Sequence, residues 1–309
     1  MNPYRGRFAP SPTGDLHFGS LVAAVASYLD ARRAGGEWLV RIEDVDQPRT
    51  VPGSADRILQ CLEAYGMHWD GAVMYQSQRD EAYAMALEQL GDLAYGCACT
   101  RSELAQHEAQ HEIRREYYPG TCRDGLREGR VARSQRVRVP DREIHWQDRR
   151  LGPQRENLAE SVGDFVLRRA DGLWAYQLAV VVDDGAQGIT DIVRGEDLLT
   201  STARQIYLQE LLRLPHPRYW HVPLVLDAHG QKLSKQTQAR PVPPSGSPEV
   251  LAQALRFLGE PVPSELEEIA LIWQWAISAL DVTVILERHG RTIRALRRRR
   301  LNHPGESWG

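Results

Sequence analysis

The segment from residue 5 to residue 42 alternates strand, helix and strand, and this order constrains the fold more than any other feature of the sequence. Residues 5–9 have strand character and end at the turn sequence Pro10-Ser11-Pro12-Thr13-Gly14. Residues 18–33 repeat apolar side chains at helical spacing, and Gly35-Gly36 ends that helix before an apolar strand at 38–42. Two strands joined by a helix over so short a distance are typical of a parallel layer, so we predict an α/β fold.

The character of the sequence changes at a proline-rich stretch, residues 241–246. Before it, strand and helix patterns alternate, and the continuous apolar run from Leu178 to Val182 is typical of a buried strand. After it, only helical patterns follow, at residues 248–258 and 264–279. We therefore predict an α/β domain over residues 1–240 and a helical appendage over residues 241–309.

Composition and charge exclude several classes of protein. The chain is 42% hydrophobic and 26% charged, as in globular rather than disordered proteins. It has no stretch of about 20 apolar residues and no apolar signal-peptide core near Met1, so we expect no membrane span and a cytoplasmic location. The net charge is only -3, so nucleic acid would need a local basic surface. Arg291, Arg294 and the run Arg297–Arg300 are one candidate, although a solvated helix end explains them equally well.

Two short segments are candidates for binding phosphate. Residues 17–20 join the first strand to the first helix, where unpaired backbone N–H groups and the helix dipole favour an anion. His17 offers a further hydrogen-bond donor there, and Gly19 permits close approach to the backbone. Far downstream, Lys232 and Lys235 flank a serine in a loop and suit a polyphosphate. The sequence contains no P-loop, which excludes a P-loop ATPase, and dinucleotide binding lacks its usual G-x-G-x-x-G fingerprint.

A set of charged and hydroxyl-bearing residues follows the predicted strands. Arg7 lies in the first strand, Glu43 comes directly after the second, and Tyr176 and Arg194 add a hydroxyl and a second cation. Guanidinium groups bind carboxylates bidentately, and a carboxylate accepts hydrogen bonds from an ammonium group. Two arginines and one glutamate therefore suit a substrate with two carboxylates and one ammonium group, such as glutamate or aspartate. The alternative is that these charges pair with one another.

The cysteines predict a metal site. The chain has four of them: Cys61, Cys97, Cys99 and Cys122. The last three fall in one segment, and three thiolates are one ligand short of the tetrahedral set that zinc prefers. On chemistry alone, His107 or His111 is the first choice for the fourth ligand. The alternative is a group of reduced core cysteines without a metal, which is also our interpretation of Cys61.

The two phosphate-binding candidates together resemble the signatures of one enzyme class. Residues 17–20 resemble the first signature of class I aminoacyl-tRNA synthetases, and residues 232–236 resemble the second. The resemblance implies a Rossmann-type catalytic core that binds ATP between the signatures. His17 would steady the α-phosphate, while Lys232 and Lys235 would hold the departing pyrophosphate together with Mg²⁺. The ATP contacts implied in this way are His17, Gly19, Ser20, Lys232, Ser234 and Lys235.

Within that class the sequence is similar to the glutamyl-tRNA synthetase branch over about residues 5–236. The matching segments are residues 7–14, 41–46, 75–79, 178–184, 188–190 and 193–197. The resemblance implies that glutamate contacts Arg7, Ser11, Glu43, Tyr176 and Arg194, and it leaves open which arginine binds which carboxylate. The branch has Thr where this chain has Val45, and Arg where it has Gln236.

The same resemblance bears on the fourth metal ligand. The family pattern is Cys-x-Cys followed by Tyr-x-x-x-Cys, and Tyr118 with Cys122 matches its second half. It therefore favours Tyr118 over Tyr117, His107 or His111. A closed set of Cys97, Cys99, Tyr118 and Cys122 would make the zinc structural and would pin an insertion at about residues 95–125.

Only 73 residues of the 309 follow Gln236, too few for the long helical anticodon-binding region of a glutamyl-tRNA synthetase. The chain therefore resembles a shortened paralogue family, the glutamyl-queuosine tRNA(Asp) synthetases. The resemblance implies that glutamate is activated without tRNA and then moved to the queuosine base at the wobble position of tRNA(Asp). Expected partners are ATP, L-glutamate and tRNA(Asp) carrying queuosine, and we expect a monomer. Two alternatives stay open: a truncated glutamyl-tRNA synthetase that charges a tRNA 3′ end, and a non-catalytic paralogue that binds RNA or glutamate.

Overall fold

The computed structural model describes residues 3–111, 117–226 and 240–278. Its central layer contains five strands in two hydrogen-bonded groups: β1 (Arg5–Phe8), β2 (Glu37–Ile42), β3 (Met74–Tyr75), β9 (Asp191–Gly195) and β10 (Arg218–Val222). β2 pairs in parallel with β1 and β3, and β10 pairs in parallel with β9. The two groups join beside β1, where the backbone N–H of Thr190 donates to the carbonyl oxygen of Arg5 at 2.9 Å. The strand order across the layer is therefore β3-β2-β1-β9-β10.

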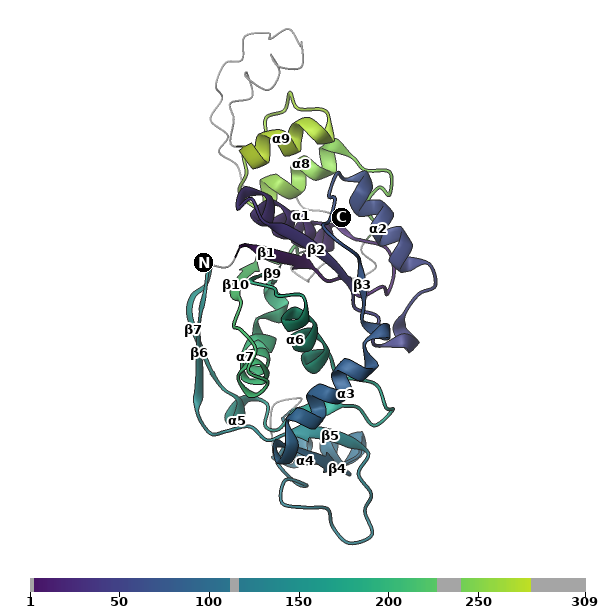
Figure 1. Cartoon of the computed structure of the whole chain (residues 1–309), viewed down its shortest axis with the longest axis vertical. Helices are drawn as coiled ribbons and strands as arrows, with labels where there is room; N and C mark the ends of the chain where they lie inside the picture. Colours follow the sequence, from purple (N-terminus) through teal and green to yellow (C-terminus); the bar gives the residue numbers. More distant parts are fainter. Residues whose placement is uncertain (1–2, 112–116, 227–239, 279–309) are drawn as a thin grey trace.

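Alternation along β2 shows how the sheet separates two apolar cores. Trp38, Val40 and Ile42 are buried in one core, whereas Leu39 packs against the other. Figure 1 shows α1 with α8 and α9 on one side of the sheet and α6 with α7 on the other. The helices are α1 (Phe18–Arg33), α2 (Ser54–Ala64), α3 (Asp80–Gln89), α4 (Arg101–His111), α5 (Leu158–Ser161), α6 (Tyr176–Ala186), α7 (Thr202–Leu211), α8 (Pro248–Phe257) and α9 (Ile269–Ser278). Short 3-10 turns occur at η1 (Gln47–Arg49), η2 (Gln76–Gln78), η3 (Gly91–Leu93) and η4 (Glu196–Ser201).

The predicted strand–helix–strand opening is confirmed as β1, α1 and β2. The predicted buried strand from Leu178 to Val182 is wrong, because this run lies inside α6. Its first four side chains are buried in the second core and Val182 is partly buried there, so the run shows no polar face. A short continuous apolar run does not distinguish a buried helix from a buried strand.

Two further groups of strands extend from this layer. A hairpin of β6 (Glu143–Asp148) and β7 (Gly152–Asn157) continues the sheet beyond β10, because β6 pairs with β10. A separate antiparallel sheet, β4 (Ala94–Cys97), β5 (Ser134–Val137) and β8 (Val166–Arg168), carries the cysteine segment at the far end of the molecule (Figure 1).

The C-terminal helices pack on the first core. The indole N–H of Trp273 in α9 donates to the carbonyl oxygen of Tyr65 at 2.7 Å, and its ring meets Tyr28 of α1 edge-on at 4.8 Å. The division at residue 240 stays a prediction, and the arginine run at 291–300 lies outside the described residues. Within the part of the chain that the structure describes, no helix is both long and apolar enough to cross a membrane.

Candidate active site

A cavity of about 420 Å³ opens at the carboxyl ends of β1, β2 and β9. From the point where β1 and β9 meet, the strands follow one another in opposite directions across the layer, and such a switch point is where open α/β sheets bind ligands. All five residues predicted to contact glutamate line this cavity: Arg7, Ser11, Glu43, Tyr176 and Arg194. They come from β1 and the turn after it, the end of β2, the start of α6, and β9. The structure thus brings the whole predicted set together, and its role in binding glutamate stays a prediction.

Two of these residues are held by protein charges. The Arg7 Nε donates to Asp184 Oδ1 at 3.0 Å, and the Arg41 Nη1 approaches the same oxygen at 2.9 Å. Glu43 Oε1 accepts from the Arg41 Nη2 at 3.3 Å. The alternative that the predicted charges pair with one another is not what the described residues show, because the partners of Arg7 and Glu43 are Asp184 and Arg41.

The pKa values of the two carboxyl groups in this network shift in opposite directions. Burial raises the pKa of Glu43, and the nearby Arg41 and Arg7 only partly offset it. Burial acts on Asp184 in the same sense, but the two arginines outweigh it and lower the pKa of that carboxyl group. Asp184 is therefore a firmly ionised counter-charge for both guanidinium groups.

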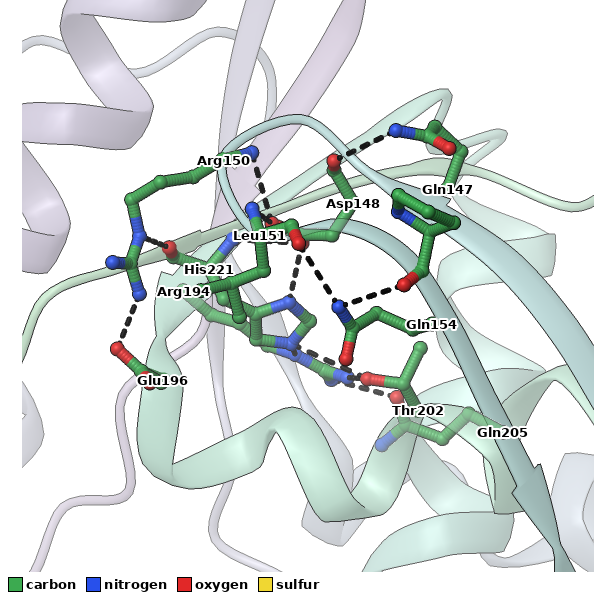
Figure 2. Close-up of polar contacts among 11 residues, drawn as sticks. Gln147, Asp148, Arg150, Leu151, Gln154, Arg194, Glu196, Thr202, Gln205 and His221 are labelled. Atoms are coloured by element: carbon green, nitrogen blue, oxygen red, sulfur yellow. Dashed lines mark hydrogen bonds and ion pairs between the residues drawn. The ribbon is translucent and has the colours of Figure 1, made fainter.

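Arg194 is held differently, by neutral acceptors alone (Figure 2). Its Nη1 donates to Gln205 Oε1 at 2.6 Å, its Nη2 to Thr202 Oγ1 at 2.9 Å, and its Nε to His221 Nε2 at 3.1 Å. Arg194 is only 4% exposed, and within the described residues it forms no ion pair with a carboxylate. No carboxylate of the described residues therefore contacts the guanidinium group directly at this wall of the cavity.

Charged side chains of both signs surround the cavity. Arg7, Arg41 and Arg194 contribute three guanidinium groups, while Asp184 and Glu43 contribute two carboxyl groups. Arg49, Arg169 and Asp46 also line the cavity. Guanidinium groups outnumber carboxyl groups among these residues, which favours a ligand that carries a carboxylate.

Sequence reasoning assigned no role to Arg41, Asp184, Thr202, Gln205 and His221. One signal was available for Asp184, because a carboxylate within an apolar run requires a buried cation. Nothing in the sequence indicates that His221 and Arg194 face each other, because the contact depends on the pairing of β9 with β10.

His17 caps the N-terminus of α1 beside this cavity. Its Nδ1 accepts from the backbone N–H of Ser20 at 3.2 Å, and Ser20 Oγ accepts from the His17 N–H at 2.9 Å. An Nδ1 that accepts leaves the proton of the neutral imidazole on Nε2. Gly19 and Ser20 lie in the first turn of α1, so the predicted phosphate contacts in this segment share one helix terminus.

The predicted contacts of the second signature, Lys232, Ser234 and Lys235, lie outside the described residues. The residues just after it meet the first signature: Val242 donates its N–H to the Leu16 carbonyl oxygen at 2.9 Å, and Pro241 forms a bridge with His17.

The predicted metal centre lies in the β4-β5-β8 region. The sulfur atoms of Cys97, Cys99 and Cys122 lie within 4.8 Å of one another, with Cys99 and Cys122 at 3.7 Å. The hydroxyl of Tyr118 is 3.4 Å from the Cys97 sulfur and 4.0 Å from that of Cys99. Zinc–sulfur bonds of about 2.3 Å place tetrahedral sulfur ligands about 3.8 Å apart, so these four groups have the spacing of a closed site.

The alternatives for the fourth ligand fit less well. His107 lies on α4 and, among the described residues, does not belong to this group of donor atoms. The side chain of His111 lies outside the described residues. Tyr118 is 2% exposed, and the Arg136 guanidinium lies over its ring at 3.7 Å. Burial alone would raise the pKa of Cys97, but hydrogen bonds, first among them the one between Cys97 and Tyr118, lower it to about 7. The cluster can therefore hold a metal ion, and Tyr118 as its fourth ligand stays a prediction.

Comparison with known proteins agrees with this geometry. The model of a family described as tRNA synthetases class I (E and Q), catalytic domain, matches residues 4–266. The chain is 61% identical to a glutamyl-Q tRNA(Asp) synthetase of Thiobacillus denitrificans over 270 residues, which cover 86% of this chain and 89% of that one. It is 57% identical to one of Dechloromonas aromatica over 280 residues, 89% and 93% of the two chains.

A solved structure shows the same fold. A glutamate tRNA ligase from Elizabethkingia meningosepticum, crystallised in complex with its amino acid, superposes with a TM-score of 0.68 at 34% identity. The match covers 76% of this chain and 52% of the ligase, so the chain spans about half the length of that enzyme. The fold is that of a class I tRNA synthetase catalytic domain. Within that class, the chain belongs to the glutamyl-Q tRNA(Asp) synthetase family.

Proposed function

We propose that this protein activates L-glutamate with ATP in the absence of tRNA and transfers it to the queuosine base at the wobble position of tRNA(Asp). The observation that carries the proposal is the cavity, where Arg194 is a buried cation that forms no ion pair with any carboxylate of the described residues. The names of the relatives from T. denitrificans and D. aromatica support the acceptor.

In the first step a carboxylate oxygen of glutamate attacks the α-phosphorus of ATP, and the bond to the pyrophosphate oxygen breaks. Arg7 and Arg194 bind the two carboxylates, Glu43 and the Tyr176 hydroxyl accept from the ammonium group, and Ser11 adds a further polar contact. His17 donates from Nε2 to the α-phosphate at the helix terminus, and Lys232 and Lys235 neutralise the leaving pyrophosphate. Mg²⁺ bound with ATP shares that negative charge. In the second step a nucleophile on the base attacks the glutamyl carbonyl carbon, and AMP leaves.

Zinc is the metal that best suits three thiolates and a phenol oxygen at this spacing. Cys97, Cys99, Tyr118 and Cys122 would hold it, and a site closed by four protein ligands is structural. Its contribution would be to fix the antiparallel sheet of β4, β5 and β8 at the end of the molecule remote from α8 and α9 (Figure 1). We further place the enzyme in the cytoplasm and expect a monomer. Light scattering at working concentration tests the oligomeric state.

The decisive experiment incubates the protein with ATP, radiolabelled glutamate and total tRNA from cells with and without queuosine. We expect label only on queuosine-containing tRNA, and we expect ATP–pyrophosphate exchange with glutamate alone. Equal labelling of both tRNA pools would overturn the queuosine acceptor. Exchange that requires tRNA(Glu) would indicate a truncated glutamyl-tRNA synthetase, and exchange under neither condition would indicate a non-catalytic paralogue.

A further inference from the structure

Behind Arg194 lies a buried pair, Asp148 at the end of β6 and His221 in β10, both fully inaccessible to solvent. His221 Nδ1 is 2.7 Å from Asp148 Oδ2 (Figure 2). The other oxygen of Asp148 accepts the backbone N–H groups of Arg150 and Leu151 at 3.0 and 2.9 Å. Asp148 therefore acts only as an acceptor, and the proton in the contact with His221 belongs to Nδ1.

This arrangement determines what the opposite edge of the imidazole can do. With its proton on Nδ1, the neutral ring presents a lone pair at Nε2, and Arg194 Nε donates to it at 3.1 Å. Thr202 Oγ1 lies 3.3 Å from the same nitrogen. A ring protonated at both nitrogens would instead direct an N–H group at the guanidinium. Burial and the neighbouring Arg194 lower the pKa of His221 to about 4, although Asp148 opposes the shift.

Strand pairing fixes the contact. His221 and Arg194 are directly paired in the parallel ladder of β10 and β9, so the two side chains start from neighbouring backbone positions. The hairpin of β6 and β7 brings Asp148 to the side of His221 that faces away from Arg194. The aspartate is thereby separated from the guanidinium by the width of one imidazole ring.

We propose that Asp148 and His221 are positioning residues that orient Arg194 for a substrate carboxylate. Asp148 fixes the tautomer of His221, and His221 Nε2 holds the Nε edge of the guanidinium without neutralising its charge. An aspartate in direct contact with Arg194 would compete with the substrate carboxylate, whereas a neutral acceptor does not. The inference rests on the proposed function, because it assigns Arg194 to a carboxylate of glutamate.

Two variants of His221 test separately its contact with Asp148 through Nδ1 and its contact with Arg194 through Nε2. His221→Gln can place an amide oxygen near the position of Nε2, so it can still accept from Arg194. His221→Asn can donate to Asp148 but is too short to reach Arg194. We expect His221→Asn to raise both the Kd of glutamate, measured by calorimetry, and the KM for glutamate in ATP–pyrophosphate exchange by about tenfold or more. His221→Gln should stay within about threefold of the wild type, and the KM for ATP should change by less than about twofold in both.

A double-mutant cycle tests whether His221 acts through Arg194. In an Arg194→Lys background the Nε donor is absent, so His221→Asn should weaken glutamate binding by no more than about threefold. Three results would overturn the inference. One is a tenfold effect of His221→Asn that persists in the Arg194→Lys background, and another is equal weakening of ATP binding and glutamate binding. The third is a folded His221→Asn variant that binds glutamate with wild-type affinity. Circular dichroism and urea unfolding establish that each variant is folded. If His221→Asn does not fold, the glutamate affinity of His221→Gln is compared with that of the wild type, and a loss of more than about threefold would overturn the inference. A wild-type protein that binds no glutamate would overturn the proposed function together with this inference.

Discussion

Gln205 accepts a hydrogen bond from Arg194 at 2.6 Å and is itself 1% exposed, so the cation is held by an uncharged side chain in a buried site. Its own amide nitrogen donates to Gln177 Oε1 at 3.0 Å. Gln205 is nearly identical in shape to glutamate, and exchanging the two changes the charge beside Arg194 with little change in volume.

We predict that Gln205→Glu raises the KM for glutamate at least about tenfold, because the new carboxylate neutralises Arg194 and repels the substrate. Exchange kinetics at varied glutamate and ATP measure it, and the KM for ATP should be unchanged. Gln209→Glu is the matched control, because Gln209 lies one turn along α7, is 2% exposed and bonds with Tyr219. Equal effects of the two substitutions would show that any buried negative charge in α7 is harmful.

A second prediction concerns Asp184, which pairs with both Arg7 and Arg41. Removing one partner from a buried charge network costs about 3–5 kcal/mol, so Asp184→Asn should lower the free energy of unfolding by that order. Urea unfolding at pH 7 measures it. Glu37→Gln removes an exposed partner of Arg5 and should cost no more than about 1 kcal/mol, so a similar loss in both variants would contradict the prediction.

The ion pairs of Asp184 also predict how the free energy of unfolding depends on pH. The pKa of Asp184 is lowered in the folded protein, so its contribution is present above the unfolded value of about 3.9. It should be lost as the pH falls through the folded pKa. The gap in unfolding free energy between wild type and Asp184→Asn should therefore be constant from pH 7 to about 5 and shrink on further acidification. A gap that widens on acidification would show that the shift has the opposite sign.

A third prediction concerns metal. We expect one zinc per chain by elemental analysis, and chelation should lower the melting temperature because metal binding stabilises only the folded state. Cys122→Ser should lose most of the zinc, whereas Tyr118→Phe should retain it with weaker affinity. Cys61→Ala is the control, because Cys61 lies in α2 within the first core, and its zinc content should equal that of the wild type. Full zinc affinity in Tyr118→Phe would remove Tyr118 from the ligand set.

The sequence was sufficient where local pattern and chemistry coincide. The turn after β1 and the helix start at His17 lie in one short segment, so their shared position follows from a strand–helix pattern alone. The cysteine cluster likewise follows from residue type and spacing. The grouping of Arg7, Glu43 and Arg194 around one cavity needed the resemblance to a known family, because these residues lie far apart in the chain.

The remaining features depend on tertiary contacts that no local pattern records. The hairpin of β6 and β7 is largely polar, and it places Asp148 behind His221 only because β6 pairs with β10. The misassigned run in α6 shows the same limit, because a run of apolar side chains without a polar face lacks the periodicity that separates helix from strand.

A fourth prediction uses the lysine content of the chain. Its only two lysines, Lys232 and Lys235, both lie in the second signature. Lys235→Ala should abolish adenylate formation and leave the fold intact, whereas Lys235→Arg retains a cation and should retain measurable exchange. An amine-acylating reagent should inactivate the wild type, and ATP should protect it. Normal exchange by Lys235→Ala would remove this lysine from its assigned role.

The last prediction separates the two tasks of His17. Its Nδ1 caps α1, and we assign its Nε2 to the α-phosphate of ATP. Asparagine is a good N-cap residue but is too short to present a donor at the Nε2 position. His17→Asn should therefore keep the unfolding free energy within about 0.5 kcal/mol of the wild type and reduce kcat for exchange by about 100-fold or more. His17→Ala should lose a similar factor in kcat and also about 1 kcal/mol of stability, because the cap is gone. A His17→Asn variant with near-normal exchange would mean that His17 serves the helix and not the nucleotide.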